Sequence, residues 1–110
     1  HCVTRRQRQM CIRDRAKSLS IDMAEFNITI NNVLTGFFDT ERLKQLNSSK
    51  AVQQGKTLSK INNEIKAIIP MKRFGKVKEY SNLVCFLASE LSGYITGINI
   101  PIDGGVLKSL

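Results

Sequence analysis

The apolar positions of the chain predict alternating helices and strands from residue 16 onward. Between residues 16 and 26, apolar side chains recur at helical spacing, at Ala16, Leu19, Met23 and Phe26, and the helix is expected to end near Asn27. The next stretch, ITINNVL at 28–34, is short, rich in Ile and Val and followed by Thr-Gly, which predicts a buried strand. A helix that leads directly into a strand is typical of an α/β unit with a parallel sheet.

The polar segment 40–69 predicts two helices separated by a break. Asp39 or Thr40 is placed to cap the first helix, ERLKQL, and the break falls in NSSKAVQQGK. Thr57 is placed to cap the second helix, LSKINNEIKAII. The apolar stripe of this second helix consists of Leu58, Ile61, Ile65 and Ile68.

The last part of the chain predicts one helix and one strand. An apolar stripe from Val77 to Leu91 indicates an amphipathic helix that ends at Ser-Gly, residues 92–93. YITGINIPI at 94–102 predicts the final strand, and Asp-Gly-Gly at 103–105 leads the chain out of it. The chain contains no internal repeat and no low-complexity stretch.

The positive charge is concentrated at the start of the chain. The net charge is +8, and residues 1–15, with five arginines and one aspartate, carry half of it. This head, HCVTRRQRQMCIRDR, lacks helical or strand periodicity. We interpret it as non-native sequence, because it resembles the translation of a sequencing adapter fused to a truncated reading frame. The alternative is a basic arm for an acidic partner. The lysines elsewhere are scattered, which favours a solvated surface over a phosphate track.

Cysteine usage and hydropathy indicate a cytoplasmic protein. No apolar run approaches the roughly 20 residues of a membrane helix, and residues 1–15 have no apolar core of a secretory signal. The three cysteines, Cys2, Cys11 and Cys85, have neither Cys-x-x-Cys nor Cys/His spacing, so we expect neither a metal site nor a disulfide framework. Cys85 lies in an apolar stretch, LVCFL, which predicts a reduced core thiol.

Four motifs of this chain, in order, match one family. ITINNVLTGFFDT resembles a sixth strand followed by a Pro-Gly-x-x-x-Thr turn, and IPMKRFG resembles a Pro-Leu-x-Arg-x-Gly stretch. NLVCFLASELSG resembles a Phe-Leu-Ala-Ser helix, and YITGINIPIDGG resembles the last strand with its Asp-Gly-Gly end. From Ala16 to its end, the chain therefore resembles the C-terminal part of the short-chain dehydrogenases/reductases.

The resemblance implies an α/β fold class. The chain would be the C-terminal portion of a doubly wound parallel-sheet (Rossmann-like) fold, incomplete in this chain, with 16–110 as its genuine part. Residues 41–69 match the family's variable lid over the substrate, which orders on binding. Apolar side chains near the lid either line a substrate pocket or pack the lid on the body: Phe37, Phe38, Leu43 and Leu46.

The resemblance also implies a nicotinamide cofactor, NAD or NADP, held by the turn after the 28–34 strand. By match, Gly36, Phe38 and Thr40 are the cofactor-binding residues, and the cofactor of such folds lies across the carboxyl ends of the strands. Taken alone, Gly36 and Thr40 equally fit a turn glycine and a helix cap. Thr35 stands where the family usually has proline, which loosens the turn because the fixed φ is lost.

The catalytic residues of the family are not in this chain. The family uses a tyrosine with a lysine four residues later, and neither Tyr80 nor Tyr94 has that lysine. A glycine-rich phosphate loop is also missing. We therefore expect no catalytic residue and no metal ligand here. The complete protein would transfer hydride between the cofactor and a carbonyl or hydroxyl substrate, while the isolated chain would be inactive.

The expected partners are a small carbonyl or alcohol substrate and further copies of the protein. The family associates through the last helix and strand, here residues 77–105. Two alternatives stay open: a non-catalytic, oligomer-forming partner of full-length subunits, and a basic nucleic-acid-binding module. The second predicts salt-dependent binding, but the chain lacks aromatic-basic interleaving and a helix-turn-helix pattern. The substrate is left open between a 3-oxoacyl-carrier-protein and a sugar or polyol.

Overall fold

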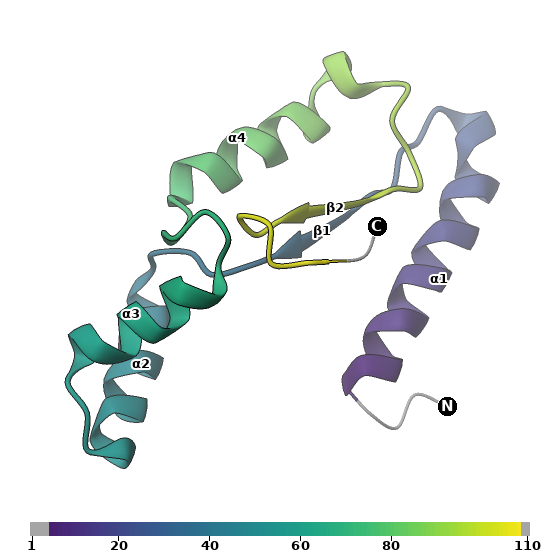
Figure 1. Ribbon diagram of the computed structural model, residues 1–110. Coiled ribbons are helices and arrows are strands. Elements are labelled where there is room, and N and C mark those ends of the chain that lie inside the picture. Colours follow the sequence, from purple (N-terminus) through teal and green to yellow (C-terminus); the bar gives the residue numbers. More distant parts are fainter. Residues whose placement is uncertain (1–4, 109–110) are drawn as a thin grey trace. The chain divides into compact units, whose positions relative to one another are not determined.

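The computed structural model describes residues 5–108 of the chain (Figure 1). Its elements follow the order helix, strand, three helices, strand, with two short 3₁₀ turns. They are α1 (Arg5–Met23), η1 (Ala24–Phe26), β1 (Asn32–Thr35), α2 (Glu41–Gln54), α3 (Leu58–Ile68), α4 (Val77–Ala88), η2 (Glu90–Ser92) and β2 (Asn99–Ile102). The contacts divide the chain into two units, one of which comprises Thr35–Asn82 and the residues from Pro101 onward.

Strands β1 and β2 pair in a two-stranded sheet. The amide of Asn32 donates to the carbonyl of Ile98 at 2.9 Å, and further along both strands the amide of Gly36 donates to the carbonyl of Ile102 at 3.1 Å. Both strands therefore advance in the same direction, and the helices between them provide the crossover that parallel pairing requires. The predicted α/β class with a parallel sheet is confirmed, with two strands in the described residues.

Helix α1 begins earlier than the apolar pattern indicates, because residues 5–15 of the arginine-rich head are helical. It ends as predicted, with Asn27 in the left-handed conformation (φ 60°) after η1. Residues 1–4 of the head lie outside the described residues, and its foreign origin stays a prediction. Two residues of the predicted apolar stripe, Leu19 and Phe26, are exposed.

Helices α2 and α3 form a hairpin and lie side by side (Figure 1). The break falls in NSSKAVQQGK as predicted, but only at its end, because α2 continues past ERLKQL to Gln54 and is capped by Gly55, whose φ is +64°. The side chain of Asn47, which is only 4% exposed, donates from Nδ2 to Oδ1 of Asn62 in α3 at 2.9 Å. This tertiary contact offsets the weak helix propensity of Asn and Ser in the segment.

The buried apolar cluster lies in this hairpin. It consists of Ala51, Ile61, Ile65 and Ile69, against which Phe74 and Val106 pack. Ile61 and Ile65 are buried as the stripe predicts, but Ile68 is 66% exposed. Helix α3 ends at Ile68, and the extended backbone of Ile69 (φ −79°, ψ 121°) turns that next side chain inward instead.

Helix α4 is shorter than its apolar stripe, since it ends at Ala88 and Ser89 caps the 3₁₀ turn η2. None of its residues is buried.

Cys85 is a free, exposed thiol, so the prediction of a core thiol is wrong in this chain. Cys11 is disulfide-bonded, a bond that the cysteine spacing does not predict. In residues 5–108, no helix combines the length and apolar character needed to cross a membrane.

Strand β2 is shorter than the predicted 94–102. Gly97, with φ +71°, interrupts the extended backbone before it. Beside the backbone bond from the Gly97 amide to the Ile30 carbonyl at 2.8 Å, the Asn31 side chain donates to the Ile95 carbonyl at 3.1 Å and accepts from the Ile98 amide at 3.2 Å. The segment before β2 is therefore held by backbone and side-chain hydrogen bonds together.

Candidate functional site

Gly36 lies at the carboxyl end of β1, where the turn to α2 begins. A Cβ atom on this residue would lie 2.6 Å from Cα of Asp103, at the end of β2. No side chain fits that distance, so the close approach of the two strand ends requires glycine. This packing explains Gly36 without a ligand, and a cofactor contact through its backbone stays a prediction.

Phe38 is fixed in the middle of the turn by a loop from further along the chain. The Gly75 amide donates to the Phe37 carbonyl, and the Asp39 amide donates to the Gly75 carbonyl, both at 2.9 Å. The Phe38 ring is 9% exposed and stands edge-on to Tyr80, with centroids 5.5 Å apart and planes at 83°. The turn is therefore fastened on both sides, by the end of β2 and by this loop.

Thr40 is the N-cap of α2. Its backbone is extended (φ −122°, ψ 161°), and its hydroxyl oxygen accepts from the Leu43 amide at 3.2 Å. The cap contact uses one lone pair, so the hydroxyl can still donate its own hydrogen to a ligand. Of the two capping candidates in the sequence, the structure selects Thr40 over Asp39.

A pocket of about 340 Å³ adjoins the turn. Five apolar residues line it: Phe37, Phe38, Met71, Pro101 and Ile102. Phe38 is the one predicted cofactor residue among them, since Gly36 and Thr40 are not in the lining. Leu43 and Leu46, the lid candidates for an apolar pocket, do not line it either.

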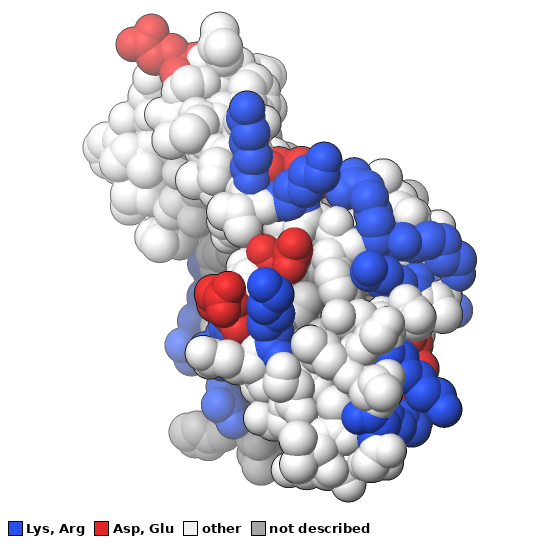
Figure 2. All heavy atoms as spheres, turned by 90° about the vertical axis from the view of Figure 1, so that its left-hand side faces the viewer, with Lys and Arg blue, Asp and Glu red and all other residues white. Residues whose placement is uncertain are grey.

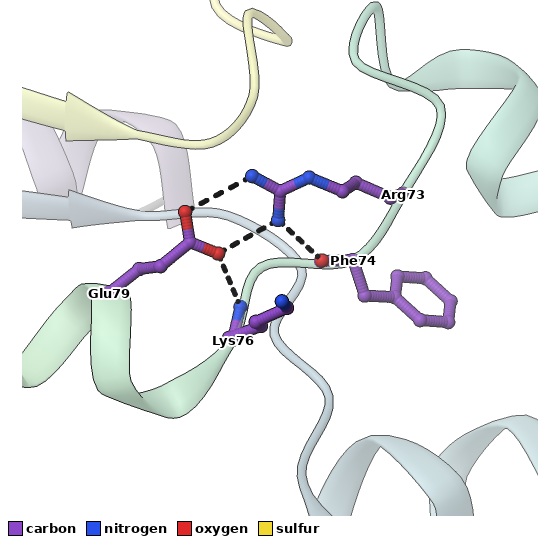
Figure 3. Close-up of polar contacts among 4 residues, drawn as sticks. All are labelled: Arg73, Phe74, Lys76 and Glu79. Carbon is purple, nitrogen blue, oxygen red and sulfur yellow. Dashed lines mark hydrogen bonds and ion pairs between the residues drawn. The ribbon is translucent and has the colours of Figure 1, made fainter.

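The pocket also has charged residues, and two of them form an ion pair (Figure 3). Arg73 binds the Glu79 carboxylate with both guanidinium nitrogens, Nη1 to Oε1 at 2.8 Å and Nη2 to Oε2 at 3.1 Å. Oε1 also accepts from the Lys76 amide at 2.9 Å, and Arg73 Nη1 donates to the Phe74 carbonyl at 3.2 Å. The ion pair fixes the loop before α4 to that helix's first turn.

These contacts shift the pKa values of both partners. The hydrogen bond from Arg73 lowers the pKa of Glu79 to about 2, with the Lys76 amide contributing, and the same pair raises the pKa of Arg73. This pair is not predictable from the pattern of the sequence. The two residues are six positions apart in a loop and a helix start, so no periodic signal joins them. The loop that carries Arg73 is indicated in the sequence by the Arg-x-Gly motif of IPMKRFG.

The Asp-Gly-Gly segment closes the pocket at the end of β2. The Asp103 carboxylate accepts from the amides of Gly105 and Leu107, both at 2.9 Å. Gly104 has φ +66°, and its carbonyl accepts from the Met71 amide at 3.1 Å. The segment therefore ties the strand end to the loop that carries Arg73.

Basic side chains outnumber acidic ones on the face shown in Figure 2, and the two kinds are interspersed. In the hairpin, Lys56 donates to Glu64 at 2.9 Å, and this hydrogen bond lowers the pKa of Glu64. Lys44 lies 3.9 Å from Glu41. Among residues 5–108, no group of three or more His, Cys, Asp or Glu side chains is placed to hold a metal ion.

Comparisons with known proteins extend over most of the chain. A family model described as enoyl-(acyl carrier protein) reductase matches residues 10–107, a match that begins inside the segment 1–15. The NADPH-dependent reductase BacG of Bacillus subtilis is 40% identical over 95 residues, which are 86% of this chain and 37% of that protein. The 3-oxoacyl-[acyl-carrier-protein] reductase FabG of Buchnera aphidicola is 43% identical over 90 residues, 82% of this chain and 32% of that protein.

Solved structures agree with these relatives. A short-chain dehydrogenase family protein from Francisella tularensis superposes with a TM-score of 0.83 at 33% identity, covering 87% of this chain and 40% of its own. YwfH, an NADPH-dependent reductase involved in bacilysin biosynthesis, superposes with a TM-score of 0.81 at 39% identity, covering 92% of this chain and 38% of its own. The chain spans about a third of the length of the curated relatives it matches. It belongs to the short-chain dehydrogenase/reductase family.

Proposed function

We propose that this chain is the part of an NAD(P)-dependent oxidoreductase that presents the nicotinamide turn. The complete protein transfers hydride between the cofactor and a carbonyl or hydroxyl substrate. The observation that carries the proposal is the turn from Gly36 to Thr40, which leaves the carboxyl end of a parallel strand, where such folds bind dinucleotides. The relatives described as NADPH-dependent reductases favour NADP over NAD.

Each residue of the turn has a distinct part in this proposal. The backbone of Gly36 and Phe38 meets the nicotinamide carboxamide, and the Thr40 hydroxyl donates to the carboxamide or the diphosphate. The turn is held on one side by Ile102 and on the other by Gly75. A turn fixed before the cofactor arrives loses little conformational entropy on binding.

The chain itself supplies no acid or base for the reaction. Tyr80, whose ring contacts Phe38, lacks the lysine that the family places four residues later. We therefore propose that the isolated 110-residue chain is inactive. The purified chain, mixed with NADPH and an acetoacetyl thioester, is expected to leave NADPH absorbance unchanged. Steady NADPH consumption by the purified chain would contradict this part of the proposal.

A chimaera tests the cofactor turn. The matched residues replace the corresponding part of the Buchnera FabG, and the chimaera is expected to oxidise NADPH with a 3-oxoacyl thioester. Thr40→Val removes the hydroxyl donor and is expected to raise KM for NADPH by about tenfold, the equivalent of one charge-assisted hydrogen bond.

Thr57→Val is the matched control. Thr57 caps α3 with the same geometry, since its hydroxyl oxygen accepts from the Lys60 amide at 3.2 Å. Both substitutions remove an N-cap, but only Thr40 belongs to the turn. Equal KM values for the two variants would refute a cofactor role of Thr40. A folded chimaera without NADPH oxidation would refute the function.

We also propose that residues 77–105 contact a second copy of the protein. Helix α4 buries none of its residues, and beyond it Leu91 is 84% exposed. Sedimentation velocity of the chimaera is expected to show an oligomer that Leu91→Lys dissociates. Val52→Lys is the control, because Val52 is equally exposed at 83% but lies in α2. An oligomer unaffected by Leu91→Lys would exclude this surface.

A further inference from the structure

We propose that a further pocket, between helix α1 and the beginning of both strands, binds a phosphoryl group. The ligand is inorganic phosphate or a small phosphomonoester. The inference does not rest on the proposed function, because no residue of the turn from Gly36 to Thr40 lines this pocket. Its volume of about 250 Å³ lies just below the roughly 300–1,000 Å³ of sites for larger organic ligands. This size suits a small anion.

One wall of the pocket comes from the beginning of the parallel pair, where backbone hydrogen bonds set the register. The Gly97 amide donates to the Ile30 carbonyl at 2.8 Å, and the Asn32 amide donates to the Ile98 carbonyl at 2.9 Å. Four residues of this region line the pocket: Ile30, Asn32, Gly97 and Asn99. The strand wall is therefore fixed by the backbone before any ligand binds.

The other wall is helix α1, which packs closely against Gly97. A Cβ atom on this glycine would lie 2.7 Å from Oγ of Ser20 and 2.9 Å from Nζ of Lys17. No side chain fits at these distances, so glycine is needed for the helix to approach. Ser20 is 2% exposed, and its hydroxyl donates to the Lys17 carbonyl at 2.6 Å. This packing holds the Lys17 ammonium beside the strand wall.

Two cationic side chains of α1, Arg13 and Lys17, line the pocket. They are four positions apart and are therefore neighbours on the helix surface. Within the described part of the chain, no hydrogen bond or ion pair engages the guanidinium of Arg13 or the ammonium of Lys17. Like charges at this spacing repel each other, and a bound dianion would remove that repulsion.

Two side-chain amides add neutral donors on the strand wall. Asn32 donates from Nδ2 to Oδ1 of Asn99 at 2.8 Å. Each amide nitrogen carries two hydrogens, so one hydrogen of Asn32 and both hydrogens of Asn99 are left for a ligand. A phosphoryl group offers three strong acceptor oxygens, and its bonds to cationic donors are shorter and stronger than bonds between neutral groups. The lining therefore offers the donors that such a group requires.

Asp14 is the one carboxylate of this lining, and it is exposed. Salt and water screen an exposed charge, so Asp14 weakens anion binding without preventing it. Arg13 and Asp14 belong to segment 1–15, whose foreign origin stays a prediction, and also to the residues 10–107 that match the family model. The pocket is present in the 110-residue chain in either case.

Side-chain amide NMR of the full 110-residue chain tests the inference. The amide signals of Asn32 and Asn99 report on the pocket. The Asn47–Asn62 pair is the matched internal reference, because it has the same kind of bond, at 2.9 Å, but lies in the α2–α3 hairpin. The probes are inorganic phosphate, glycerol 3-phosphate and succinate, at constant ionic strength and about pH 7.5, where a phosphomonoester carries close to two charges.

We expect phosphate to shift the Asn32 and Asn99 signals and to leave those of Asn47 and Asn62 in place. Succinate should bind about tenfold more weakly, because its two charges lie on separate carboxylates. Tighter binding of glycerol 3-phosphate supports the site with a phosphomonoester as ligand, whereas tighter binding of phosphate supports it with the free ion. No shift with either phosphate compound, or equal binding of succinate, would overturn the inference.

Charge substitutions on α1 test the two cations. Arg13→Gln and Lys17→Gln are each expected to weaken phosphate binding about tenfold, the equivalent of one hydrogen bond to a charged group. Arg15→Gln is the matched control, since it removes the same charge from the same helix at a residue outside the lining. It should change the affinity by no more than about twofold, and Asp14→Asn should increase it. Equal losses in all three glutamine variants would reduce the effect to general charge attraction and overturn the inference.

Urea unfolding gives a second measurement. A ligand that binds only the folded chain raises the urea midpoint, so phosphate should raise the midpoint of Arg15→Gln. It should raise that of the double variant Arg13→Gln/Lys17→Gln much less. An equal rise in both variants would overturn the inference, because phosphate would then act only as a salt that strengthens apolar burial.

Discussion

Gly75 lies so close to the Phe38 ring that a Cβ atom on it would stand 2.6 Å from Cε1 of that ring. The two residues are far apart in sequence and joined by a parallel bridge. The glycine is therefore needed for space, and not for backbone freedom, because its φ is not among the positive values of the chain. The position of the turn from Gly36 to Thr40 depends on this contact.

Gly75→Ala is expected to displace the Phe38 ring and to lower the free energy of unfolding by about 1–3 kcal/mol, the usual cost of overpacking. Urea titration followed by circular dichroism measures the change. Gly55→Ala is the control, since a Cβ there meets nothing within 4 Å and only its φ of +64° opposes the substitution. Adding Phe38→Leu to Gly75→Ala should restore part of the loss, and no recovery would show that the ring is not the obstacle.

The Asn47–Asn62 hydrogen bond is expected to couple α2 with α3. Asn47→Ala leaves a polar group of Asn62 unpaired at a partly buried site and should cost about 1–3 kcal/mol of unfolding free energy. The double variant Asn47→Ala/Asn62→Ala should cost less than the sum of the single variants. Asn63→Ala, on the exposed side of α3, should change stability by no more than about 0.5 kcal/mol. Additive losses would show that the two amides act independently.

The two isoleucines Ile61 and Ile68 of α3 offer a matched test of the core. Ile61 is fully buried, whereas Ile68 is 66% exposed. Ile61→Val should lower the unfolding free energy by about 0.5–1.5 kcal/mol, because it removes one methylene from a packed site. Ile68→Val should leave it within about 0.5 kcal/mol. Equal losses at both positions would place Ile68 in the core, as the sequence pattern predicts.

The Arg73–Glu79 pair predicts a loss of stability in acid. Because the pKa of Glu79 is lowered from 4.5 to about 2 in the folded chain, its contribution is complete above pH 4.5 and disappears as the pH falls toward 2. The urea midpoint of the unsubstituted chain should therefore fall more steeply between these values than that of Glu79→Gln. Glu41→Gln, at an exposed carboxylate 3.9 Å from Lys44, is the control. Parallel pH profiles for Glu79→Gln and the unsubstituted chain would contradict the role of the pair.

Much of the local structure follows from neighbouring residues and was predictable. Thr40, Thr57 and Asn27 lie at helix ends as expected, because capping depends on one side chain and the next few amides. The class of fold was predictable for the same reason, since helix and strand periods alternate along the chain. The order of the four motifs along the chain then indicated the family.

The incorrect predictions concern contacts between distant residues. Helix α2 continues through a polar segment because Asn47 meets Asn62, a contact that no periodicity encodes. Because α3 ends at Ile68 and the backbone of the next residue is extended, the side chain of Ile69 enters the core and that of Ile68 does not. The bridge between Phe38 and Gly75 joins two loops, and the Arg73–Glu79 pair joins a loop to a helix. Gly36 and Thr40 were predicted from family motifs, and the structure gives each a packing or capping role, while their contact with a cofactor awaits the chimaera.

The separate core of the α2–α3 hairpin has a consequence for how relatives diverge. Its buried side chains, Ala51, Ile61, Ile65 and Ile69, contact one another and two residues outside the helices, Phe74 and Val106. Outer positions of the hairpin can therefore mutate without disturbing the strands that carry the turn. The outer residues of the hairpin can then vary among relatives while the turn from Gly36 to Thr40 keeps its backbone bonds to Ile102 and Gly75.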